Sequence, residues 1–145
     1  MNQALTDLYN TAIRLTMPIL QAPVKPLPQG IDLSGQTAIV TGSSNGIGTE
    51  IVAQLLERKI STVILAVRNV AKGEAARTEV LSRPSVKKVA SKAVVKVMKL
   101  DVEEYSSVQS FAKQFLAEHS ELHILILNAG IGVLKRDVVA STGHE

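Results

Sequence analysis

The alternation of short apolar runs with segments of helical spacing most constrains how this chain of 145 residues can fold. A continuous run of β-branched and aliphatic residues is typical of a parallel strand that is covered on both faces. Four such runs follow residue 35: QTAIV at 36–40, TVILAV at 62–67, VVKVMKL at 94–100 and HILIL at 123–127. Helices between them would make each connection a right-handed crossover. The sequence therefore predicts the α/β class, with helices on both faces of a parallel sheet.

Three helices are predicted between these strands, over about 46–59, over 70–82 and after residue 106. In the first, one apolar face is formed by Ile47, Ile51, Val52, Leu55 and Leu56. We expect Ser106 or Ser107 to cap the third helix. Its apolar positions have i, i+3, i+4 spacing, and they are Val108, Phe111, Ala112, Phe115 and Leu116.

A basic segment lies between the second predicted helix and the third strand. From Arg83 to Lys99 there are six lysines or arginines and no acid. A nucleic-acid surface would place aromatic residues or a groove-reading helix beside such charges, and aromatic residues make up only 3% of the chain. We therefore interpret the segment as a solvated connection and expect no nucleic-acid partner. The absence of cysteine also excludes disulfides and thiolate metal sites.

The first 34 residues are predicted to precede the folded domain, which we place at 35–145. Residues 4–16 have the spacing of a short amphipathic helix, and residues 17–30 hold four of the five prolines, as an extended linker would. The helix can lie on a membrane surface or pack against protein, and its weak basic character favours packing. No apolar run is long enough to span a bilayer, and Arg14 interrupts any secretory signal. We expect a cytoplasmic protein.

Three glycines lie between the first strand and the first helix, in TGSSNGIG at 41–48. Gly42 would permit a tight turn, while Gly46 and Gly48 would leave space for a pyrophosphate or for a close helix-to-strand contact. The helix that follows points free N–H groups and its positive end at this loop. Glycines placed between a strand and a helix predict a dinucleotide phosphate site far more specifically than a lone glycine motif does.

This stretch resembles the T-G-x-x-x-G-I-G motif of the short-chain dehydrogenase/reductase family. LDV at 100–102 resembles the adenine-contacting segment of that family, and NAG at 128–130 resembles its N-A-G element, so the likeness runs from residue 35 to about 134. The retinol-dehydrogenase-like and metabolite-tailoring members are the most similar. The resemblance implies a Rossmann-type sheet, here incomplete with about four strands in the order 3-2-1-4. It also implies hydride transfer between a nicotinamide cofactor and an alcohol or carbonyl.

The resemblance implies cofactor contacts in three segments. The phosphate loop would comprise Gly42, Ser43, Ser44, Asn45, Gly46, Ile47 and Gly48, with backbone and hydroxyl donors. The adenine site would comprise Asp101 and Val102, and the ribose segment Asn128, Ala129 and Gly130. Leu127 stands where the family's usual N-N-A-G element has its first asparagine. Asp101 can instead be an acid that leads a helix, and Asn128 can be a purely structural polar group.

The end of the second strand indicates which nicotinamide cofactor would bind. An acid there would accept a hydrogen bond from the ribose 2′-OH, whereas a base would pair with a 2′-phosphate. The chain has Arg68 there and no acid, so we predict NADP(H), with NAD(H) as the weaker candidate. Lys72 is a second candidate base, and Arg68 as an ordinary solvated charge is the alternative.

The catalytic groups that the resemblance would imply are missing. The family uses a tyrosine with a lysine four residues later, but Tyr9 is followed by Ile13 and Tyr105 by Gln109. No histidine has metal-ligand spacing with a carboxylate. We therefore predict no catalytic residue, no metal and no unaided hydride transfer. A non-catalytic nucleotide-binding module and the inert product of a shortened gene are the alternatives, and the open edge of the fourth strand would suit a partner chain.

Overall fold

A computed structural model describes residue 28 and residues 30–130 of this chain. The chain divides into two units, Met1–Gly30 and Ile31–Glu145. Every element named below belongs to the second unit, and the predicted leader helix lies outside the described residues. The boundary at 34 stays a prediction.

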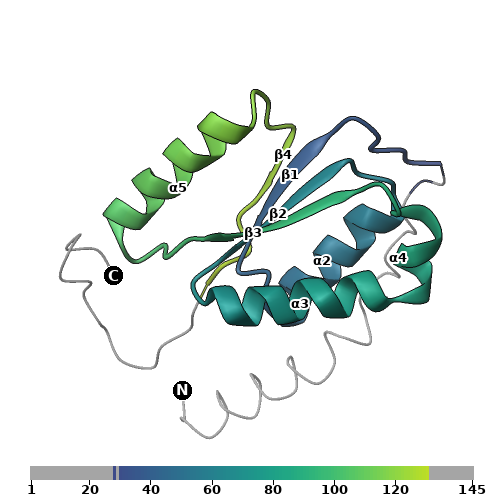
Figure 1. Ribbon diagram of the computed structural model, residues 1–145, viewed down its shortest axis with the longest axis horizontal. Helices are drawn as coiled ribbons and strands as arrows, with labels where there is room; N and C mark the ends of the chain where they lie inside the picture. Colours follow the sequence, from purple (N-terminus) through teal and green to yellow (C-terminus); the bar gives the residue numbers. More distant parts are fainter. Residues whose placement is uncertain (1–27, 29, 131–145) are drawn as a thin grey trace, which may run out of the picture. The chain divides into compact units, whose positions relative to one another are not determined.

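Four parallel strands form one sheet in the order β3-β2-β1-β4, as predicted (Figure 1). They are β1 (Thr37–Thr41), β2 (Thr62–Val67), β3 (Val94–Lys99) and β4 (Ile124–Ile126). Both β1 and β2 lie inside the sheet, and all but their first residues are buried. This burial explains why their sequences are continuous apolar runs without alternation. The architecture is of the Rossmann type.

Helices cover both faces of the sheet, and each face has its own core. One core packs the sheet against α2 (Gly46–Glu57), α3 (Val70–Ser82) and α4 (Pro84–Val89), and its buried members include Val40, Leu56, Leu65 and Val80. The other core lies under α5 (Tyr105–Glu118), which Figure 1 shows on the opposite side of the sheet from α2 and α3. Its members are Ile39, Ile64, Ala66, Met98, Leu100, Phe111 and Phe115.

The basic segment after α3 contains a helix that the prediction of a solvated connection omitted. Pro84 occupies the first turn of α4, where its missing N–H costs no intrahelical hydrogen bond. Val86 is buried in the first core, whereas Lys87 and Lys88 in the last turn are exposed. Lys87 and Lys88 are solvated as predicted, whereas Arg83 and Lys96 are part-buried in ion pairs. One apolar residue anchors the short helix.

The predicted cap of α5 was wrong. The helix begins at Tyr105 with Glu104 as its N-cap, and no side chain caps it. The hydroxyl of Ser107 accepts a hydrogen bond from the Asp101 N–H at 2.9 Å instead. The apolar faces were also predicted too wide, because Ile47 on α2 and Leu116 on α5 have 74% and 71% of their surface exposed.

The strand β4 lies at one end of the sheet and pairs with β1 alone among the described strands. Leu125 is opposite Ile39 in the register, yet its side chain is 53% exposed, and Leu127 is 77% exposed. This end of the sheet therefore presents apolar side chains beside backbone groups that no described strand pairs. Within the described residues, no helix is long and apolar enough to cross a bilayer.

Candidate functional site

The phosphate-loop candidates lie where β1 ends and α2 begins. Gly42 has a φ of +66°, and a Cβ there would come within 2.8 Å of the Ala129 Cα. A Cβ on Gly48 would lie 2.5 Å from the Gly42 carbonyl oxygen and 2.7 Å from Asn128 Nδ2. Both glycines are therefore required by contacts within the protein, because backbone atoms cannot move aside cheaply. They bring the loop, α2 and the segment after β4 into close contact.

The residues between these glycines differ in what they offer a ligand. Ser43 is fully buried, and its hydroxyl donates to the Val40 carbonyl at 2.9 Å. The hydroxyl of Ser43 is thus used inside the protein, and the predicted place of Ser43 in the phosphate loop stays a prediction. Ser44 is half-buried, while Asn45, Gly46 and Ile47 are exposed. Ile47 was predicted to lie on the apolar face of its helix, and that prediction is wrong. Because its side chain is exposed, a ligand can contact it.

The amino end of α2 has the electrostatics of an anion site. Asn45 is the N-cap, and its side chain makes no capping hydrogen bond. The first turn contains no acid that would neutralise the positive end of the helix dipole. The first N–H groups of a helix lack intrahelical partners, so this end can donate to phosphate oxygens.

Thr41 connects the two strand ends that border the loop. Its Oγ1 accepts hydrogen bonds from the Asn128 N–H at 3.0 Å and the Ala129 N–H at 2.9 Å. The Asn128 side-chain amide donates to the Thr41 and Gly42 carbonyls at 3.1 and 3.4 Å. These bonds favour the structural role for Asn128. Sequence reasoning missed Thr41, although its place directly before Gly42 was a usable signal.

The predicted adenine-side residues lie in the loop between β3 and α5. Asp101 Oδ1 accepts a hydrogen bond from the Glu103 N–H at 3.2 Å, so this carboxylate already orders the loop that leads into α5. Val102 is 56% exposed beside it, and Gly130, in the ribose segment, is also exposed. The structure thus supports a local structural role for Asp101, while the predicted ligand contacts of Asp101, Val102 and Gly130 stay predictions.

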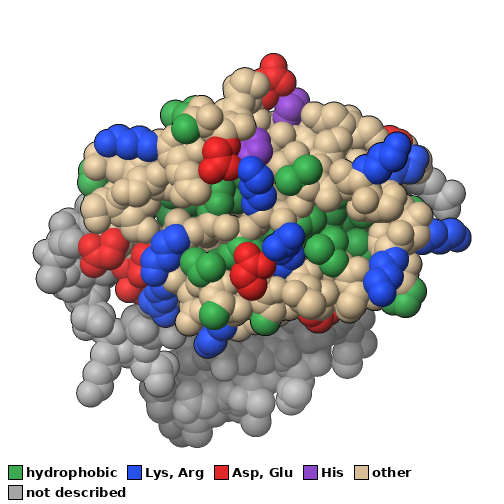
Figure 2. Space-filling view, viewed as in Figure 1, with side chains coloured by type: hydrophobic (Ala, Val, Ile, Leu, Met, Phe, Trp, Pro, Cys, Tyr) green, Lys and Arg blue, Asp and Glu red, His purple; other side chains and the backbone are tan. Residues whose placement is uncertain are grey.

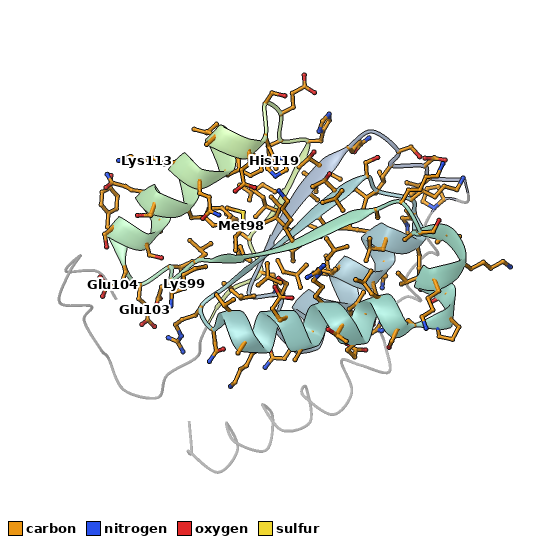
Figure 3. The ribbon with its side chains drawn as sticks, viewed as in Figure 1. Met98, Lys99, Glu103, Glu104, Lys113 and His119 are labelled. Carbon is orange, nitrogen blue, oxygen red and sulfur yellow. The ribbon has the colours of Figure 1, made fainter. Side chains whose placement is uncertain are left out.

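Arg68 follows β2 and turns toward that same loop. Its Nη1 lies 3.5 Å from Glu103 Oε2, and 63% of its side chain is exposed. The Lys99 Nζ donates to the Arg68 carbonyl at 2.8 Å, which fixes the backbone of Arg68 to the end of β3. Figure 3 shows Lys99, Glu103 and Glu104 together near the end of β3, before α5 begins.

A hollow of about 560 Å³ lies between the phosphate loop and α3. Ser44, Asn45 and Gly46 line it from the loop side, and Lys72 lines it from α3. Its lining residues do not include Arg68. Of the two predicted bases, the structure therefore brings Lys72, and not Arg68, into the same hollow as the loop.

The far wall of this hollow contains a compact ion-pair cluster. Arg83 Nη1 lies 2.7 Å from Glu50 Oε2, and its Nε lies 2.9 Å from Glu79 Oε1. Hydrogen bonds to these carboxylates raise the pKa of Arg83, and the pairing with Arg83 lowers the pKa of Glu50. One guanidinium thus pairs with two carboxylates, so this cluster carries a net charge of −1.

Catalytic and metal-binding groupings are not found in the described part of the chain. No group of three or more acidic, histidine or cysteine side chains there could hold a metal. Tyr105 is 65% exposed at the start of α5, and Tyr9 lies outside the described residues. On the face in Figure 2, the described lysines and arginines are scattered with acids among them, so no basic stripe crosses it.

Comparison with known families and proteins identifies relatives of this chain. The family model described as short chain dehydrogenase matches residues 36–143. The Short chain dehydrogenase macD of Penicillium terrestre is 53% identical over 127 residues, which are 88% of this chain and 38% of that protein. The Short-chain dehydrogenase/reductase tropG of Talaromyces stipitatus is 52% identical over 125 residues, again 38% of its length. The chain thus spans well under half the length of these relatives.

Two solved structures also match this chain over part of their length. A metagenomic short-chain oxidoreductase in complex with NADP matches with a TM-score of 0.58 and 34% identity, over 69% of this chain and 41% of that one. The menthone neomenthol reductase of Mentha piperita matches with a TM-score of 0.57 and 34% identity, over 66% of this chain and 32% of that one.

Proposed function

Because this chain belongs to the short-chain dehydrogenase/reductase family, we propose that residues 35–145 are the NADP(H)-binding portion of an oxidoreductase. The family resemblance predicted from the sequence is confirmed. The full reaction would interconvert an alcohol and a carbonyl in metabolite biosynthesis, and the bound cofactor would supply or accept the hydride. The exposed loop at the amino end of α2, which has no acid in its first turn, is the observation that carries the proposal.

The described residues fit a dinucleotide phosphate group. Backbone N–H groups at Gly46 and Ile47 would donate to the pyrophosphate, and the side chain of Ser44 would border it. The Thr41 hydrogen bonds would hold the ribose segment 128–130 against this loop. Binding and orientation of the cofactor are therefore the tasks that these residues can perform.

The choice of NADP(H) over NAD(H) rests on two bases and a missing acid. Lys72 shares the hollow with the loop, and Arg68 lies at the end of β2, where no carboxylate follows the strand. A cation near a 2′-phosphate makes charge-assisted hydrogen bonds. The solved relative in complex with NADP is consistent with this choice.

Calorimetric titration with NADPH and NADH tests the proposal. The wild-type chain should bind NADPH more tightly than NADH, and Lys72→Gln should weaken NADPH binding about tenfold, the value of one charge-assisted bond. Lys113→Gln on α5 removes the same charge on the other face of the sheet and should leave binding unchanged. If neither NADPH nor NADH gives heat on titration, the proposal is contradicted, and the inert product of a shortened gene is favoured.

A second arm separates the cofactor-binding portion from a working enzyme. The sequence has no tyrosine with a lysine four residues later, so the chain alone should not oxidise NADPH with any carbonyl of a broad panel. Turnover by the purified chain would contradict this expectation. NADPH binding without turnover is also what a non-catalytic binding module would give.

We further propose that a partner chain covers the open edge of β4. Apolar Leu125 and Leu127 are exposed there, and β4 itself carries no charged or proline residue of the kind that protects edge strands.

A further inference from the structure

The ion pair between Arg68 and Glu103 joins the two strand ends that border the predicted adenosine site. Arg68 follows β2, and Glu103 lies in the loop after β3, which is the neighbour of β2 in the sheet. Val67 is opposite Lys99 in the register, so the two chain segments leave the sheet side by side. The guanidinium and the carboxylate are therefore near each other because of the sheet topology.

Each partner of this pair has a backbone group in a hydrogen bond to a neighbouring residue. The Lys99 Nζ holds the Arg68 carbonyl at 2.8 Å, and the Glu103 N–H donates to the Asp101 carboxylate at 3.2 Å. The side chains are more exposed, at 63% for Arg68 and 40% for Glu103. The pair can thus separate by side-chain rotation while both loops keep their shape.

We propose that Glu103 is a specificity-determining residue that restrains Arg68 and so limits the preference of the site for a nucleotide carrying a 2′-phosphate. This inference rests on the proposed function. While Nη1 of Arg68 pairs with the Glu103 carboxylate, the guanidinium cannot offer that N–H group to a 2′-phosphate, which favours bidentate pairing. The negative charge of Glu103 also repels a phosphate that approaches Arg68. A nucleotide with a 2′-hydroxyl group carries no such charge, so it incurs neither cost.

The two bases then have different roles. Lys72 already lines the hollow beside Ser44 and Asn45, so it can meet the 2′-phosphate without breaking an ion pair to another described residue. Arg68 offers all its guanidinium N–H groups to the phosphate only after release from Glu103. An exposed ion pair of this kind contributes little energy, so the restraint should change affinity by a small factor and not act as an absolute block.

Glu103→Gln tests the role, with Glu104→Gln as the matched control. The control removes the same charge one residue along, at the N-cap of α5, where the side chain makes no capping bond. Adenosine 2′,5′-bisphosphate and adenosine 5′-monophosphate serve as probes, because they differ only at the 2′ position. We expect E103Q to bind the bisphosphate about two- to fivefold more tightly, with 5′-monophosphate binding unchanged, as an exposed pair implies. E104Q should behave as the wild type does.

Arg68→Gln identifies whether Glu103 acts through Arg68. In the R68Q background, E103Q should increase affinity for the bisphosphate less than it does in the wild type, because only the repulsion by Glu103 remains to be removed. An equal gain in both backgrounds, or equal behaviour of E103Q and E104Q, would overturn the inference. Thermal unfolding of each variant reports whether its fold is kept. If the wild type binds neither probe nor NADPH, the proposed function fails, and this inference fails with it.

Discussion

At the scale of single residues, hydrogen bonds within the protein separate structural groups from groups available to a ligand. Ser43 and Asn128 both match the family motifs, but their polar side chains are bonded to backbone carbonyls. Ile47 and Gly46 match the same motifs and are exposed. A motif therefore identifies the site as a whole, while burial and bonding decide what each member of the motif does.

Thr41 should contribute more to stability through its hydroxyl than through its methyl group. Thr41→Val would remove the acceptor of the Asn128 and Ala129 N–H groups at a buried position. Both bonds are part-buried, and a typical intramolecular hydrogen bond contributes about 0.5–1.5 kcal/mol. We therefore expect the loss of two bonds to lower the unfolding free energy in urea by about 1–3 kcal/mol. Thr41→Ser keeps the oxygen and should lose about 1 kcal/mol or less. Equal losses in the two variants would show that the hydroxyl bonds contribute nothing measurable.

At the scale of elements, the strands, α2 and α5 could be predicted because their apolar residues form continuous runs or regular faces. The pattern of α3 is weaker, since its buried residues are only Gly73, Ala76 and Val80. The sequence order of β1, β2, β3 and β4 alternates with helices, which indicated the parallel sheet. The helix α4 was missed because only Val86 of its six residues is buried, and one residue creates no periodicity. The cap of α5 was missed because Ser107 accepts from Asp101, a tertiary contact that spacing alone does not indicate.

The helix α4 should prove to be part of the core despite its charges. Val86 is 1% exposed, so Val86→Ala should lower the unfolding free energy by about 1–3 kcal/mol, as loss of buried methyl groups does. Val89 on the same helix is 38% exposed, and Val89→Ala should change stability by about 0.5 kcal/mol or less. Urea unfolding of both variants compares them directly. If V86A is as stable as V89A, Val86 does not anchor α4 in the core.

At the scale of the whole molecule, β3 and β4 are the two edge strands of the described sheet, and they differ in the helices that pack against them. On the β3 side, α3 and α5 both pack against the strand. On the β4 side, the three-residue strand carries exposed Leu125 and is followed by exposed Leu127. Unpaired backbone groups beside apolar side chains favour the addition of another strand. Sequence reasoning could predict this edge, since the strand order follows from the family resemblance, but it could not predict what covers it.

Association through the β4 edge should therefore depend on concentration and on Leu125. In sedimentation experiments we expect the wild-type chain to self-associate, and Leu125→Lys to weaken association about tenfold, because the charge would lose water at the contact. Val94 lies on β3, at the opposite edge, and is 46% exposed. Val94→Lys adds the same charge there and should leave association unchanged. A wild-type chain that stays monomeric at all concentrations would rule out a second copy as the partner. If V94K weakens association as much as L125K does, net charge, and not the β4 edge, controls association.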